Sequence, residues 1–190
     1  METNPKTVTA FDGDHILASG ALADIALTVK KASAKRLILI FEDETGRALD
    51  IDVRGSDETV LERLAHTHPD LVDAPRGPGR PKLGVVAREV TLLPRHWDWL
   101  NEQPGGASVT LRKLVDDARR STKARQASAR EATYRFISAM AGNRSHFEEA
   151  TRALFANERR SFERLIAQWP VDIRNHTRKL SAAAFVDKSA

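Results

Sequence analysis

Apolar residues in the first 68 positions alternate or recur at helical spacing, which predicts an α+β module with two hairpins and two helices. The first hairpin turns at Asp12-Gly13, a pair that favours tight turns between strands, and the second turns within DETG. Ser56 precedes two acidic residues, which is typical of the start of a helix. The predicted order is strand 7–11, strand 15–20, helix 21–32, strand 36–42, strand 47–53 and a helix after Ser56.

The regular pattern stops at Pro69 and resumes after Gly84. Four prolines and three glycines in these sixteen residues exclude a helix or a central strand, which predicts a linker. The segment VVAREVTLL (85–93) is rich in β-branched residues and predicts a strand, and Pro94 suits the first turn of a short helix. The following PGG ends that helix, and Ser108 is expected to cap a second helix that extends to residue 120.

Residues 121–190 carry apolar stripes at helical spacing. Ser145 and Glu148 stand at the spacing of a capping box, and Pro170 suits the start of a last helix. The sequence therefore predicts an α+β fold that ends in a helical region. The predicted segments are an acidic α+β module (1–68), a linker rich in Pro, Gly and Arg (69–84), a strand–helix–helix module (85–120) and a helical C-terminal region (121–190).

The amino-acid composition excludes several classes of protein and several kinds of functional site. The chain of 190 residues has no cysteine, which excludes disulfides, thiolate metal sites and cysteine nucleophiles. The longest strongly apolar run, residues 37–41, is too short to cross a bilayer, and the first residues lack the apolar core of a signal peptide. We therefore expect a cytoplasmic protein with no membrane partner.

The net charge of +4 is distributed unevenly along the chain. Residues 1–70 contain 8 Lys and Arg against 13 Asp and Glu, a balance of −5, whereas residues 71–190 contain 22 against 13, a balance of +9. An acidic front and a basic rear predict modules with different roles. The basic surplus suits contact with nucleic acid, contact with an acidic protein or a solvated surface.

Signatures of catalysis are thin. The sequence contains no Gly-x-Ser-x-Gly elbow, no phosphate-cradling glycine loop and no His-Glu-x-x-His zinc motif. The six histidines are dispersed, and His66 and His68 are expected at a helix end rather than around a metal ion. The sequence thus predicts no catalytic residue, no metal site and no cofactor, and it leaves an enzyme of unrecognised type open.

Residues 85–120 resemble a ribbon–helix–helix unit in the order and spacing of their elements. In that fold, two chains pair their strands into a ribbon that enters the major groove of double-stranded DNA, so the resemblance implies a homodimer and a DNA partner. Two registers are open, one that turns Thr91 towards the groove beside Glu89 and one that turns Arg88 towards it beside Val90. The alternative is a strand that completes an ordinary sheet under the two helices.

The linker segment RGPGRPK (76–82) resembles the core of an AT-hook, with Pro78 in the place of the usual first arginine. Arg80 between two small or rigid neighbours makes a thin, extended segment that fits the narrow minor groove of A·T-rich DNA. A plain soluble tether is the alternative. The predicted nucleic-acid-binding residues are Arg76, Arg80, Pro81, Lys82, Arg88, Thr91, Arg95, Arg112 and Lys113.

Four longer stretches resemble a bacterial family that is catalogued as a domain of unknown function. They are TAFDGDHILASG, GRPKLGVVAREVTLLPRHWDWL, QPGGASVTLRKLVDDARR and YRFISAMAGNRSHFEEATRALFA. The resemblance implies a bacterial, cytoplasmic protein and supplies no activity, cofactor or site residue.

Two main hypotheses follow from these patterns. The first is a DNA-binding or transcription-regulatory protein, in which Arg80 enters the minor groove, Arg88 and Thr91 reach base edges and the other cations neutralise phosphates. The second is a non-enzymatic protein-interaction or structural protein without nucleic-acid contact, whose cations serve as a solvated surface. Arg112 and Lys113 fit either hypothesis, because they lie on a helix that also carries acidic residues.

Overall fold

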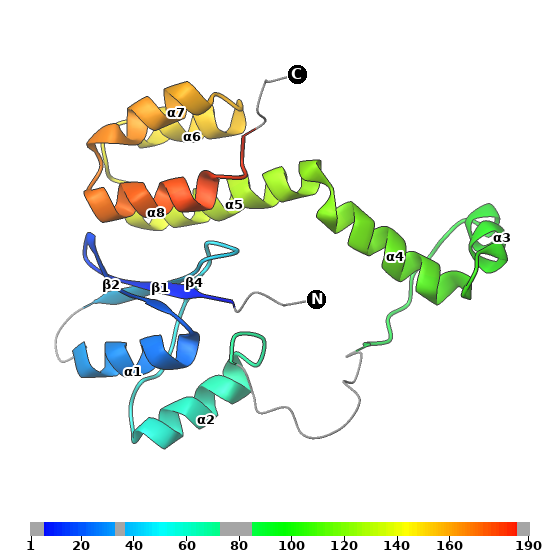
Figure 1. The fold of residues 1–190 in the computed structure, drawn as a ribbon, viewed down its shortest axis with the longest axis horizontal. Helices are drawn as coiled ribbons and strands as arrows, with labels where there is room; N and C mark the ends of the chain where they lie inside the picture. The colour runs from blue at the N-terminus through cyan, green and yellow to red at the C-terminus, as the bar shows by residue number, and fades with distance from the viewer. Residues whose placement is uncertain (1–5, 33–36, 73–84, 186–190) are drawn as a thin grey trace. The chain divides into compact units, whose positions relative to one another are not determined.

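The computed structural model describes residues 6–32, 37–72 and 85–185, and the chain divides into two compact units (Figure 1). Unit 1 combines residues 1–74 with residues 126–190, and unit 2 consists of residues 75–125. The fold is mixed α+β, with the strands near the N-terminus and helices towards the C-terminus, which confirms the predicted class. The first and last segments of the chain therefore share one unit, although the sequence separates them.

Unit 1 is built on a four-stranded antiparallel sheet. Its strands are β1 (Val8–Asp12), β2 (His15–Gly20), β3 (Ile38–Glu42) and β4 (Ala48–Leu49), in the order β2-β1-β3-β4. Both predicted hairpins are present, since β1 pairs with β2 and β3 pairs with β4. The last strand is shorter than predicted. The Asp52 carboxylate accepts a hydrogen bond from the backbone N–H of Arg54 (3.0 Å), a local bond that competes with pairing along the ladder.

Two helices cover one face of the sheet (Figure 1). They are α1 (Leu22–Ala32) and α2 (Asp57–Thr67), and both lie where the apolar spacing predicts them. The hydroxyl of Ser56 accepts a hydrogen bond from the backbone N–H of Thr59, so the predicted cap is confirmed. The core on this face consists of Val8, Ala10, Leu22, Ile25, Ala26, Val29, Ile40, Val60 and Leu64.

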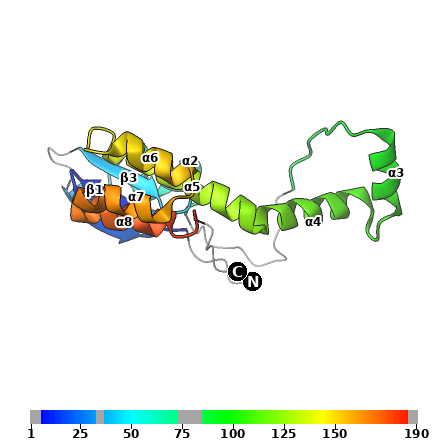
Figure 2. The ribbon, with the colours of Figure 1, turned by 90° about the horizontal axis from the view of Figure 1, so that it is seen from above.

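The C-terminal helices cover the opposite face of the sheet (Figures 1 and 2). They are α5 (Thr122–Met140), α6 (Phe147–Phe155), α7 (Arg159–Leu165), the 3₁₀ helix η1 (Ile166–Gln168) and α8 (Val171–Ser181). The ring of Phe136 on α5 contacts those of Phe11 and Phe41, with ring centroids 5.4 and 5.0 Å apart. These contacts join the sheet and the C-terminal helices into one core.

Two predicted helix caps are wrong. His146, and not Ser145, precedes α6, and it adopts the left-handed conformation at φ 65°. The carbonyl of Ser145 instead accepts a hydrogen bond from the indole N–H of Trp169 (2.9 Å). In unit 2, Gly105 at φ 90° precedes α4, so that Ser108 lies inside the helix. In both cases a left-handed residue sets the start of the helix in place of a hydroxyl cap.

The described part of unit 2 consists of two helices, the segment that leads into them and the first residues of α5. The helices are α3 (Pro94–Glu102), which begins at proline as predicted, and α4 (Gly106–Arg120). The strand predicted over residues 85–93 is wrong for the single chain, because these residues form no helix or ladder with any described residue. An isolated extended segment has no edge with which to pair, so it forms a strand only when a second edge is supplied.

Candidate functional site

Helix α4 separates its apolar and its charged residues onto two sides. Leu111, Leu114 and Val115 recur at helical spacing on one side, and the basic residues lie off that stripe. All fifteen residues of α4 are described, and none of them is buried. Leu114 is 47% exposed and Val115 is 55% exposed. An amphipathic helix of this kind normally buries its apolar face, so this face lacks its cover within the described part of the chain.

A small apolar cavity lies between α3 and α4 within unit 2. Its volume is about 270 Å³. Leu100 forms part of its wall and is the one buried residue among the described residues of unit 2. Trp99, the residue before Leu100, also lines the cavity and is 48% exposed. The complete lining is Leu92, His96, Trp99, Leu100, Leu111 and Leu114.

The predicted nucleic-acid-binding residues lie on two stretches of unit 2. Arg88, Thr91 and Arg95 are exposed on the segment that leads into α3 and on its first turn. Arg112 and Lys113 are exposed on neighbouring positions of α4. The remaining four, Arg76, Arg80, Pro81 and Lys82, lie outside the described residues.

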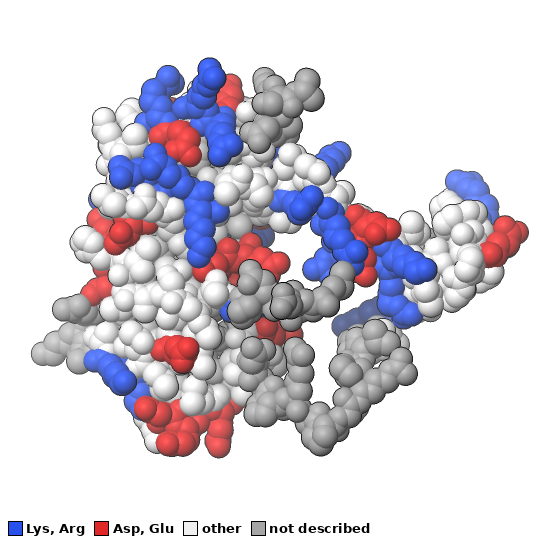
Figure 3. Space-filling view, in the orientation of Figure 1, with Lys and Arg blue, Asp and Glu red and all other residues white. Residues whose placement is uncertain are grey.

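The positive charge of the chain is concentrated in unit 2. Its residues 75–125 contain 11 Lys and Arg against 5 Asp and Glu, a balance of +6, whereas the remainder contains 19 against 21, a balance of −2. Along α4 the cations alternate with acidic side chains (Figure 3). One such pair is Asp116 with Arg120, 4.0 Å apart at the i,i+4 spacing. The surplus is therefore a property of the whole unit rather than of one uniformly basic helix.

Unit 1 contains a buried polar cluster around Asp43, the residue after β3. Its carboxylate is 8% exposed and accepts hydrogen bonds from the hydroxyls of Thr7 (2.6 Å) and Thr9 (2.7 Å) and from Nζ of Lys179 (2.8 Å). Burial raises the pKa of the Asp43 carboxyl, but the hydrogen bonds from Lys179, Thr7 and Thr9 outweigh burial and hold its pKa below the usual value. Asp43 therefore carries its charge inside the fold.

His176 on α8 lies beside this carboxylate. Its side chain is 2% exposed and packs against the rings of Phe11 and Phe136, at centroid distances of 5.3 and 4.6 Å. Nε2 of His176 is 3.7 Å from Oδ1 of Asp43, beyond hydrogen-bond reach, and it has no hydrogen-bond partner among the described residues. Burial lowers the pKa of His176 to about 4, against the opposing effect of Asp43, so the ring is neutral at pH 7.

The sequence analysis did not single out this cluster. The signal that could have found it is the position of His176 on the inward stripe of the last helix, three residues after Ile173 and four before Leu180. When the apolar stripe of a helix packs into a core, a histidine on that stripe is buried with it. Its carboxylate partner lies 133 positions earlier in the chain, and no local pattern connects the two.

The other titratable residues give no metal centre in the part of the chain that the structure describes. No three of its His, Asp or Glu residues converge as a set of metal ligands. His66 lies in the last turn of α2 and His68 follows that helix as its C-cap, the helix-end positions expected from the sequence.

The chain matches one protein family over residues 7–181, and that family is described as "Uncharacterized protein conserved in bacteria (DUF2239)". The chain belongs to this family. The DUF2239 match includes the strands of unit 1, the helices of unit 2 and all of α5 to α8. No curated protein and no solved structure matches the chain. Within the described ranges, no helix combines the length and the apolar character needed to span a bilayer.

Proposed function

We propose that this DUF2239 protein is a DNA-binding regulatory protein that acts as a homodimer through unit 2. The observation that carries the proposal is the combination, in one small unit, of an uncovered apolar face on α4 and a charge balance of +6. An uncovered apolar face favours association with a partner, and a surplus of cations favours a polyanion as the ligand.

The dimer would use the segment before α3 and the apolar side of α4. Residues 85–93 of two copies would pair antiparallel, so that each supplies the edge that the other lacks. Val90 is 53% exposed and Leu114 is 47% exposed, and both would be covered by the second copy. This arrangement agrees with the ribbon–helix–helix resemblance of residues 85–120, in which the helices of both chains build a shared core.

DNA contact would come from the cations that surround the ribbon. Thr91 would reach base edges in the major groove in the register that covers Val90, because a two-stranded ribbon fits that groove. Arg88 shares the face of Val90 and would reach base edges only in the opposite register. Arg95, Arg112 and Lys113 would neutralise phosphates, which positions the protein without reading sequence. The linker residues Arg76, Arg80, Pro81 and Lys82 would extend the contact into an adjacent minor groove.

Fluorescence anisotropy with labelled random and A·T-rich duplexes across a salt series tests this function. We expect binding at low salt that weakens steeply with salt, because each neutralised phosphate contributes a slope of about −0.9 in log K against log salt. The double variant Arg112→Gln/Lys113→Gln should lower that slope by roughly 1 to 2. Arg160→Gln, at an exposed arginine of unit 1, is the control. Absence of binding at low salt, or binding that ignores salt, would remove the proposal.

A second candidate function is protein association without nucleic acid. The apolar cavity of about 270 Å³ beside the half-exposed Trp99 favours it, because aromatic residues at such cavities commonly anchor protein interfaces. Light scattering that shows a dimer, together with anisotropy that shows no DNA binding at low salt, would support this alternative over the first.

A further inference from the structure

The turn between β3 and β4 packs directly against helix α5. Gly46 in this turn has φ +64°, and a Cβ atom added there would overlap the carbonyl oxygen of Ala132. Only glycine permits both the backbone conformation and this close approach. The contact fixes the turn against the helix one turn before Arg135.

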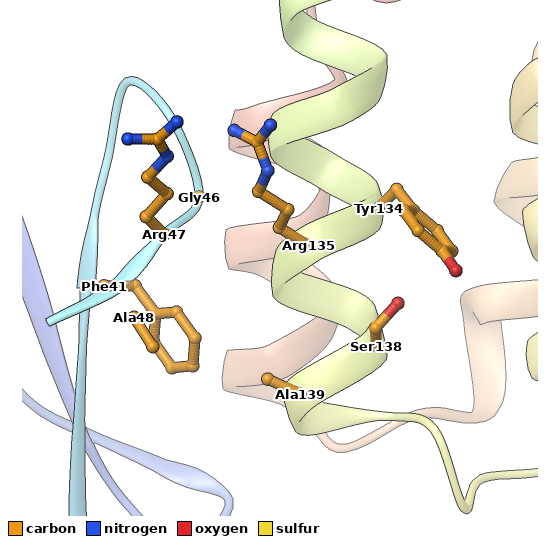
Figure 4. Close-up of a pocket in the computed structure, with 8 residues that line it drawn as sticks. All are labelled: Phe41, Gly46, Arg47, Ala48, Tyr134, Arg135, Ser138 and Ala139. Carbon is orange, nitrogen blue, oxygen red and sulfur yellow. The ribbon is translucent and has the colours of Figure 1, made fainter.

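This packing brings two arginines to the same end of a cavity. Arg47 follows Gly46 in the turn, Arg135 lies on α5, and their guanidinium groups face each other across the opening (Figure 4). Arg135 is held in place, because it donates to the carbonyl of Thr45 (3.3 Å) and pairs with Glu131 (2.9 Å). Arg47 is exposed, and its guanidinium has no hydrogen bond or ion pair with a described residue.

The remaining wall of the cavity is mixed in character. The cavity is largely open to solvent, its volume is about 610 Å³, and no Asp or Glu belongs to its described lining. Ala48 and Ala139 supply apolar surface beside the completely buried ring of Phe41, and Tyr134 and Ser138 complete the lining (Figure 4). Glu131 already pairs with the Arg135 guanidinium, so, among the described residues, Arg47 carries the unpaired positive charge at this opening, and an anion between the two arginines would pair with it.

We propose that this cavity binds a small molecule that carries a phosphate group. Arg47 and Arg135 hold the phosphate oxygens, because a guanidinium presents paired N–H donors that match an oxyanion. The apolar wall takes the carbon part of the ligand. A phosphate monoester is preferred over a carboxylate because it offers three terminal oxygens instead of two to the N–H donors of the two arginines. The site lies wholly in unit 1 and does not depend on DNA binding by unit 2.

Isothermal titration calorimetry of the full chain with phenyl phosphate, inorganic phosphate and benzoate, at matched ionic strength, tests this site. We expect phenyl phosphate to bind most tightly, inorganic phosphate more weakly and benzoate at least tenfold more weakly than phenyl phosphate. Arg47→Gln should weaken phenyl phosphate binding by about 10- to 100-fold, as expected for the loss of charge-assisted hydrogen bonds.

Because Arg47 is exposed, its substitution should change ligand binding without changing the stability of the fold. Arg47→Gln should leave the urea midpoint of unfolding unchanged, since no described partner is lost, and Arg160→Gln should leave phenyl phosphate binding within twofold of the parent protein. Nuclear magnetic resonance shifts caused by phenyl phosphate should concentrate on residues 46–48 and 134–139. No binding, benzoate binding as tight as that of phenyl phosphate, or equal losses in both variants would overturn the proposal.

Discussion

Helices of both units carry an apolar stripe, and the two stripes are covered to opposite degrees. In unit 1, α5 turns Phe136 and Ile137 into the core, and both are completely buried. In unit 2, α4 carries an apolar stripe of similar spacing, and none of its fifteen residues is buried. The spacing of apolar residues therefore predicts which face of a helix is apolar. It does not predict what buries that face, because the burying residues come from distant segments or from another molecule. Unit 1 supplies its own cover, whereas the apolar side of α4 in unit 2 has no cover among the described residues.

The largest expected effect comes from removing a core ring of unit 1. Phe136→Ala should lower the free energy of unfolding by about 3–5 kcal/mol, because it leaves a cavity among Phe11, Phe41 and His176. Leu114→Ala is the matched change on the uncovered face of unit 2, and it should alter the unfolding of unit 1 by less than about 0.5 kcal/mol. Urea unfolding followed by the fluorescence of the buried Trp169, in a background with Trp97→Phe and Trp99→Phe, measures both. Equal losses would mean that α4 is part of the same core.

Acid should destabilise unit 1 through His176. Its pKa in the folded protein is about 4, below the ordinary value of 6.5, so the unfolded chain binds more protons between these values. The stability is therefore complete above pH 6.5, falls as the pH drops through this window and levels off below pH 4. The full contribution is about 3 kcal/mol.

Urea unfolding at pH 7 and pH 4 separates this contribution from those of other groups. His176→Gln cannot titrate, so its stability should fall by about 3 kcal/mol less than that of the parent protein over the same interval. Asp43, whose pKa is lowered, contributes stability that is lost only as the pH falls further. An identical acid response in both proteins would show that His176 is not buried as described.

The turn that carries Arg47 should be intolerant of a side chain. Gly46→Ala should lower the free energy of unfolding by about 2 kcal/mol or more. The alanine would be strained in the left-handed backbone conformation, and its Cβ would overlap the carbonyl of Ala132. Gly13 has a similar φ of +59° with no atom within 4 Å of an added Cβ, so Gly13→Ala should show the strain alone, about 1 kcal/mol. Thermal unfolding of the two variants gives the comparison. Equal costs would mean that the turn does not press against α5.

The smallest expected effect distinguishes a true helix cap from a predicted one. Ser56→Ala removes the hydroxyl that accepts from the Thr59 N–H and should cost about 1 kcal/mol. Ser145→Ala should cost close to nothing, because only the carbonyl of Ser145, which the substitution keeps, accepts the Trp169 bond. Urea midpoints measured side by side decide this. A comparable loss of stability in Ser145→Ala would show that the Ser145 hydroxyl caps α6 after all.

The features that sequence analysis predicted correctly are local ones. Both hairpins, the Ser56 cap and the inward stripe of α5 follow from patterns within about twenty residues. The features that it missed depend on contacts between distant positions. Residues 1–74 and 126–190 form one unit, and His176 on α8 lies 3.7 Å from Asp43 directly after β3. The segment 85–93 has strand propensity but pairs with no strand among the described residues, so its sequence alone does not make it a strand.

Disulfide trapping gives the most direct test of the central claim, that unit 2 of two copies pairs through residues 85–93. The native chain has no cysteine, so any disulfide formed by a single-cysteine variant must join two copies. Single cysteines introduced in turn from Arg88 to Leu92 should cross-link most rapidly at the position nearest the two-fold axis, where a residue faces its own copy. A cysteine at exposed Glu62 on α2 is the control. We predict a trapped dimer that still binds duplex DNA; cross-linking no faster than that of the control would contradict the account.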